Sequence, residues 1–136
     1  MSIQTVGLIG VGLMGHGIGK NILAKGFKLQ VLAHKNRGPI ESLKGFGAQE
    51  AASIAALVQA SDILIICVTG SPQVEAVMRG ADGVFAQGKK VSFASGRTLF
   101  REGDGVNDVY CLTAGNVVVT RLGENGERQI LALFRD

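Results

Sequence analysis

The stretch VGLIGVGLMG, from Val6 to Gly15, joins an apolar run to a G-x-G-x-x-G turn that opens an amphipathic segment. In such a turn Gly10 bends the chain, Gly12 lets a pyrophosphate approach the backbone, and the third glycine lets helix and strand pack closely. The start of the following helix offers free N–H groups and partial positive charge to phosphates. The stretch therefore predicts a dinucleotide site on an α/β fold. The alternative is a glycine-rich turn without a ligand.

Strand and helix signals alternate from residue 1 to about 88, which predicts a truncated Rossmann-type parallel sheet with helices. A short strand is also expected between the second and third helices. The run Ile63–Val68 is apolar on both faces, which predicts a central strand covered by helices. The longer expected elements are strands at 5–9, 28–33 and 63–68, and helices from the glycine turn to about Gly26, from Pro39 to Lys44, over 51–59, and from Ser71 to near Gly80.

Beyond Gly88 the apolar residues recur with period two, which predicts a change to antiparallel β structure. Residues 96–119 are interpreted as short strands joined by glycine turns, and 117–134 as a hairpin. The segment 91–94 could be the last strand of the first part or the first strand of the second. We therefore predict two segments, a dinucleotide-binding segment at 1–88 and a β-rich segment at 89–136.

The composition narrows the class of protein. A hydrophobic content of 46% with 18% charged residues is typical of a globular chain with a core. The net charge of +3 is spread over both halves and aromatic residues make up 5%, which disfavours a nucleic-acid partner. The longest wholly apolar run, 63–68, is far shorter than the roughly 20 residues of a membrane span. We expect no nucleic-acid or membrane partner.

The two cysteines, Cys67 and Cys111, are far apart and lack neighbouring histidines, so no metal site is expected. Lone thiols, together with the absence of a basic segment before the first apolar run, favour a cytoplasmic protein without a signal peptide.

The end of the second expected strand carries basic residues where an NAD site has an acidic one. A basic cluster without a carboxylate suits a 2'-phosphate and favours NADP over NAD. The alternative is a solvated basic loop. The residues in question are Ala33, His34, Lys35, Asn36 and Arg37.

Residues 4–86 resemble the NADP-binding domain of the β-hydroxyacid dehydrogenases, the group containing 3-hydroxyisobutyrate dehydrogenase and 6-phosphogluconate dehydrogenase. The resemblance rests on GLIGVGLMG at 7–15, N-x-x-x-x-G at 21–26, GA at 47–48 and SDILIICVTGSPQVEAVM at 61–78. It implies cofactor contacts with the pyrophosphate and the nicotinamide ribose. These would come from Leu13 and Met14 at the pyrophosphate and from Cys67, Val68 and Thr69 near the nicotinamide ribose.

The chain departs from that family in two respects. The family's Asn-Arg-Thr follows the second strand directly, whereas Asn36 and Arg37 lie just beyond the ungapped positions. Which basic residue would meet a 2'-phosphate therefore stays open. The family's substrate segment, catalytic lysine and helical second domain have no counterpart, so no catalytic residue is expected.

Residues 89–136 resemble the opening strands of a cyclic-nucleotide-binding β-roll of the catabolite-activator and FNR-like regulators. The matching residues are GRTLFREGD at 96–104, Tyr110, Leu112, Gly115, 117–119 and GERQILAL at 126–133. In that family the phosphate is held by a later F-G-E helix and an arginine. Since neither follows here, cyclic-nucleotide binding is not expected.

Three hypotheses remain. The leading one is a recombined or engineered chimera that at most binds NADP(H) without turnover. The alternatives are an NADP-dependent β-hydroxyacid dehydrogenase-like oxidoreductase fragment and a cyclic-nucleotide sensor module. Because a shortened β-roll leaves unpaired strand edges, we expect self-association, as a dimer or higher oligomer, through residues 89–136.

Overall fold

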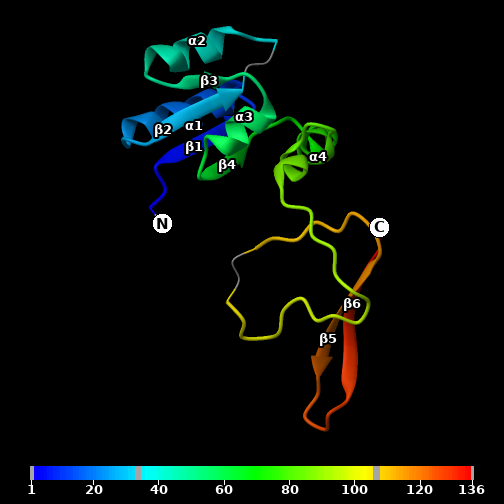
Figure 1. Cartoon of the computed structure of the whole chain (residues 1–136). Coiled ribbons are helices and arrows are strands. Elements are labelled where there is room, and N and C mark those ends of the chain that lie inside the picture. The colour runs from blue at the N-terminus through cyan, green and yellow to red at the C-terminus, as the bar shows by residue number, and fades with distance from the viewer. Residues whose placement is uncertain (1, 33–34, 106–107, 136) are drawn as a thin grey trace. The chain divides into compact units, whose positions relative to one another are not determined.

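The computed structural model describes residues 2–32, 35–105 and 108–135, and the chain forms two compact units, Met1–Val91 and Ser92–Asp136 (Figure 1). The first unit alternates strands and helices, and the second contains a β-hairpin. The predicted order, α/β followed by antiparallel β, is confirmed.

In the first unit four parallel strands form one sheet in the order β3-β2-β1-β4. All helices of the described residues belong to this unit. The expected order of strands and helices up to the fourth helix is confirmed. The elements are β1 (Thr5–Ile9), α1 (Leu13–Ala24), β2 (Lys28–Leu32), α2 (Gly38–Gly45), β3 (Gln49–Ala51), α3 (Ile54–Gln59), β4 (Ile63–Ile66), α4 (Ser71–Arg79) and the 3-10 helix η1 (Val84–Gln87).

The side chains of the sheet alternate between two apolar clusters, one on each face. On one face, Val6 and Leu8 of β1 pack with α1, α2 and the inward residues of β2. On the other face, Ile9 packs with Leu57 of α3, and Val77 of α4 lies against this cluster. Helices on both faces leave the carboxyl ends of the strands as the region where loops meet, which is where open α/β sheets bind ligands.

The strand β4 is an edge strand, so the prediction of a central position is wrong. Among the described residues β4 pairs only with β1, and Ile63 is 43% exposed. An apolar run indicates that helices cover both faces of a strand. It does not indicate how many strands lie beside it. The strand also ends at Ile66, before the predicted end at Val68, and the carbonyl of Cys67 then lies against Gly10 of the glycine turn.

The start of β4 is joined to the start of β1 by one carboxylate. Asp62 Oδ2 accepts hydrogen bonds from the backbone N–H groups of Gln4 and Thr5, each 2.9 Å long. These bonds stabilise the ionised form and hold the pKa of Asp62 below its ordinary value. These hydrogen bonds therefore fix the register of β4 against β1 at the start of the two strands.

In the second unit β5 (Asn116–Leu122) and β6 (Arg128–Arg135) form an antiparallel hairpin, as predicted. A register shift between Val119 and Thr120 marks a β-bulge. The turns at Gly96, Gly103 and Gly115 have positive φ angles of 77°, 90° and 97°, which glycine adopts without strain.

The strands expected over 91–94 and between the glycine turns before Asn116 are absent from the described residues. This prediction is wrong because alternating apolar and polar residues form a half-buried strand only where a neighbouring strand pairs with them. Here the segment is held by turns and by one edge-to-face contact, with the rings of Phe93 and Tyr110 6.2 Å apart at 71°.

Candidate functional site

The turn after β1 is held closed by contact between two glycines and the end of β4. Gly10 has φ +95°, and a Cβ atom there would collide with the backbone carbonyl oxygen of Cys67. A Cβ atom at Gly15, which is buried, would collide with the carbonyl oxygen of Gly10. Both glycines are therefore required for the chain to fold this way, as the motif predicts.

Gly12 differs from these two glycines. It is the N-cap residue of α1, with an extended backbone, and a Cβ atom there would meet no atom within 4 Å. No side chain caps the helix and no acidic residue lies in its first turn. The exposed fractions of the next two residues, Leu13 and Met14, are 95% and 75%. The first-turn N–H groups therefore face an open surface that can accept an anion.

The segment after β4 lies beside this turn. The Cys67 N–H donates a 2.8 Å hydrogen bond to the Ile9 carbonyl, which places 67–69 next to the end of β1. Cys67 and Val68 are half-buried and Thr69 is exposed. The structure thus brings together the glycine turn and Cys67–Thr69, two parts of the predicted site that are far apart in the sequence.

The end of β2 supplies the third part of the predicted site. Ala33 and His34 lie outside the described residues. Lys35 is exposed, and Asn36 Oδ1 accepts a 3.3 Å hydrogen bond from the N–H of Gly38 at the start of α2. Asn36 therefore has a local structural partner.

Arg37 is paired with carboxylates from two neighbouring elements. Its guanidinium donates to both carboxylate oxygens of Glu50, with Nη1 at 2.8 Å from Oε1 and Nη2 at 2.9 Å from Oε2. Nη2 also lies 2.8 Å from Oε1 of Glu41. α2 and β3 therefore each bring a carboxylate to Arg37, although residues 33–37 themselves contain none. That this stretch favours NADP over NAD stays a prediction.

Lys44 completes this network, with Nζ at 3.2 Å from Glu41 and 3.5 Å from Glu50. Two cations and two carboxylates leave the four side chains with no net charge. The hydrogen bonds from Arg37 are the main cause that lowers the pKa of each carboxyl group, and they raise the pKa of Arg37. Glu41 could have been found from its i,i+4 spacing to Arg37, whereas Glu50 depends on strand pairing.

Chemistry other than nucleotide binding finds little support in the parts of the chain that the structure describes. There, no three His, Cys, Asp or Glu side chains gather in a way that could hold a metal ion. His16 Nε2 lies 3.0 Å from the hydroxyl of Ser42, a pairing between two helices. Within the same residues, no helix has the length and apolar character needed to cross a bilayer.

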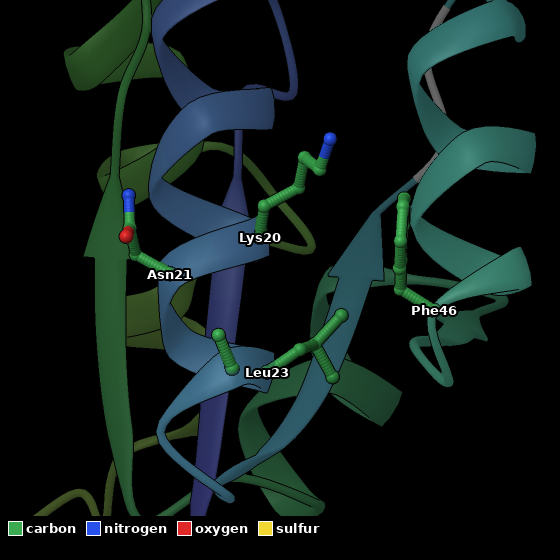
Figure 2. A pocket seen from close by; sticks show the side chains of 5 residues that line it. Lys20, Asn21, Leu23 and Phe46 are labelled. Atoms are coloured by element: carbon green, nitrogen blue, oxygen red, sulfur yellow. The ribbon is translucent and has the colours of Figure 1, made fainter.

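An open hollow lies along the second half of α1, away from the glycine turn (Figure 2). Its walls include Leu23 and Ala24 and the ring of Phe46, and Lys20 Nζ lies 4.7 Å from the centre of that ring. Its polar groups, Lys20 and Asn21, are exposed. The hollow shares no residue with the predicted cofactor site.

Two family models match the chain. Residues 5–95 match the NAD binding domain of 6-phosphogluconate dehydrogenase. The chain belongs to this family. Residues 90–136 match the cyclic nucleotide-binding domain. The resemblance of each segment is thereby confirmed, and a 6-phosphogluconate dehydrogenase-type NAD(P)-binding domain is followed by a cyclic nucleotide-binding segment.

Relatives of this NAD(P)-binding domain include 2-hydroxy-3-oxopropionate reductase of Escherichia coli (strain K12), which is 35% identical over 79 residues. The match covers 57% of this chain, and the chain spans 26% of that reductase. Most of the reductase therefore lies outside the similarity.

Solved structures similar to the domain include cofactor complexes. Psf3 in complex with NADP+ and 2-OPP is 34% identical, with a TM-score of 0.56 over 60% of this chain and 29% of its own. An imine reductase from Myxococcus stipitatus in complex with NADP+ is 27% identical, with a TM-score of 0.53 over 57% and 27%. Homologous domains thus bind NADP+.

Proposed function

We propose that the first unit binds NADP(H) at the turn Gly10–Gly15 and does not turn over a substrate. The observation that carries this proposal is the open surface at Gly12, where an uncapped helix start meets a turn that two other glycines close tightly. In this proposal the pyrophosphate lies on the first turn of α1, beside Leu13 and Met14. The nicotinamide ribose lies near Cys67–Thr69.

The adenosine end of the cofactor lies near Lys35, Asn36 and Arg37 in this proposal. His34 was predicted to contribute there and stays a prediction. Lys35 is exposed, and no ion pair involves it among the described residues. The NADP+ complexes of two homologous domains also support a 2'-phosphorylated cofactor.

NADP+ is expected to bind about tenfold more tightly than NAD+, since one charge-assisted contact to a 2'-phosphate is worth that factor. Calorimetric titration of one sample with NADP+, NAD+ and cyclic AMP measures this. Equal affinities, or tighter binding of NAD+, would contradict the prediction. Cyclic AMP is expected not to bind, and saturable binding of it would favour the sensor module instead.

We also propose that the two segments were joined by recombination or engineering. The match to the NAD(P)-binding domain ends at residue 95 and the match to the cyclic nucleotide-binding domain begins at 90, so one family gives way to the other within a few residues. Residues 90–136 thus match a different family from the domain that precedes them. The alternative is a dehydrogenase-like fragment that obtains its substrate residues from another chain.

The free thiols of Cys67 and Cys111 support a cytoplasmic location.

We further propose that residues 89–136 mediate self-association with a second copy of the chain. Among the described residues β5 and β6 pair only with each other, so each has an open edge. The opposed side chains of Val118 and Leu133 are 48% and 46% exposed. A two-stranded hairpin is marginal in water, and pairing with another copy adds strands and covers these residues.

Sedimentation at micromolar concentration is expected to show a dimer or larger species. Leu133→Lys places a charge on the hairpin and is expected to weaken association by about tenfold or more, because a lysine would have to be buried. Asn125→Lys adds the same charge at the exposed hairpin turn and serves as the matched control. A monomeric parent chain, or equal association of both variants, would contradict the proposal.

A further inference from the structure

The Arg37 guanidinium already occupies the kind of contact that a 2'-phosphate would need. Two of its N–H groups bind the carboxylate of Glu50 side by side, at 2.8 and 2.9 Å. This paired geometry is the one through which arginine recognises both carboxylates and phosphates. A phosphate that reaches Arg37 would therefore find these N–H groups already hydrogen-bonded to Glu50.

Glu50 is placed there by the sheet. It lies in β3, and its backbone partner in β2 is Val31, close to the end of the strand from which Arg37 follows. Its side chain is 24% exposed, compared with 52% for Glu41. Water therefore screens the pair with Glu50 less than the pair with Glu41, and the strand backbone holds Glu50 in position.

Resting on the NADP(H) site proposed above, we infer that Glu50 is a specificity-determining residue that lowers the preference for NADP+ by competing with the 2'-phosphate for Arg37. NAD+ lacks this phosphate, so its binding does not require Arg37 to be released. The competition therefore acts on NADP+ alone. Glu41 takes a smaller part, since it accepts one hydrogen bond from Arg37.

The test is calorimetric titration of Glu50→Gln with NADP+ and NAD+. Loss of the carboxylate charge frees Arg37, so the affinity for NADP+ is expected to rise about fivefold and that for NAD+ to change less than about twofold. In an Arg37→Gln background the same Glu50→Gln change is expected to produce no gain, because the effect passes through Arg37. Asp82→Asn, at an exposed turn, removes an equal charge and is expected to leave both affinities unchanged.

Several results would overturn the inference. An unchanged NADP+ affinity would do so, as would a gain that persists without Arg37, because that gain would be a general effect of charge. Weaker NAD+ binding in Glu50→Gln would instead mean that Glu50 contacts the ribose directly. These results leave NADP(H) binding itself intact. If the parent chain binds neither nucleotide, the proposed function fails and this inference fails with it.

Discussion

Gly12→Val is expected to lower the affinity for NADP+ by at least about a hundredfold. The added side chain would stand where the pyrophosphate must approach the first-turn N–H groups of α1, and the loss of two charge-assisted hydrogen bonds accounts for such a factor. The fold is expected to survive, because a Cβ atom at Gly12 meets no atom within 4 Å and the backbone there is extended. Titration calorimetry and the circular dichroism spectrum measure the two effects.

Gly45→Val is the matched control for this variant. Gly45 lies in α2, and a Cβ atom there also meets no atom within 4 Å. Its NADP+ affinity is expected to equal that of the parent chain. Undiminished binding by Gly12→Val would mean that the turn has only a structural role.

The largest expected loss of stability comes from Leu57→Ala. Leu57 is fully buried and is the buried residue of the short helix α3, on the face of the sheet where Ile9 and Ala51 complete the buried cluster. Shortening this side chain to alanine is expected to lower the free energy of unfolding by about 2–5 kcal/mol, because buried methyl groups are lost and a cavity remains. This is a large share of the stability of a typical domain.

Urea unfolding followed by circular dichroism at a helix wavelength measures this loss, because all helices of the described residues lie in the first unit. Leu13→Ala removes the same atoms from a side chain that is 95% exposed, and its expected cost is under about 0.5 kcal/mol. Similar losses in the two variants would show that α3 does not hold this face of the sheet.

The sequence predicted the first unit well because its signals are local. The glycine turn, the apolar strands and the helix-starting Pro39 each act within a few residues, and all of these elements are present. The place of β4 at the edge of the sheet was not predictable in this way. The apolar residues of Ile63–Ile66 are the same whether one strand or two lie beside them.

The candidate site likewise has one part that the sequence predicted and one part that it did not. The sequence places the free N–H groups at Gly12 and the close approach at Gly10, since the motif encodes both within six residues. It could not place Glu50 against Arg37, because that contact follows from the pairing of β3 with β2, and charges alone do not reveal it. Arg37, which belongs to a basic stretch of the sequence, is therefore paired with two carboxylates in the fold.

The space around each of the three glycines also decides which substitutions the turn would tolerate. Any side chain at Gly10 or Gly15 meets backbone atoms, so a library of variants selected only for folding should keep glycine at both positions. The same library should accept many residues at Gly12, where there is open space. Glycine would become obligatory at Gly12 only when the selection also demands nucleotide binding, so comparing the two selections would report directly whether ligand binding is a pressure on this chain.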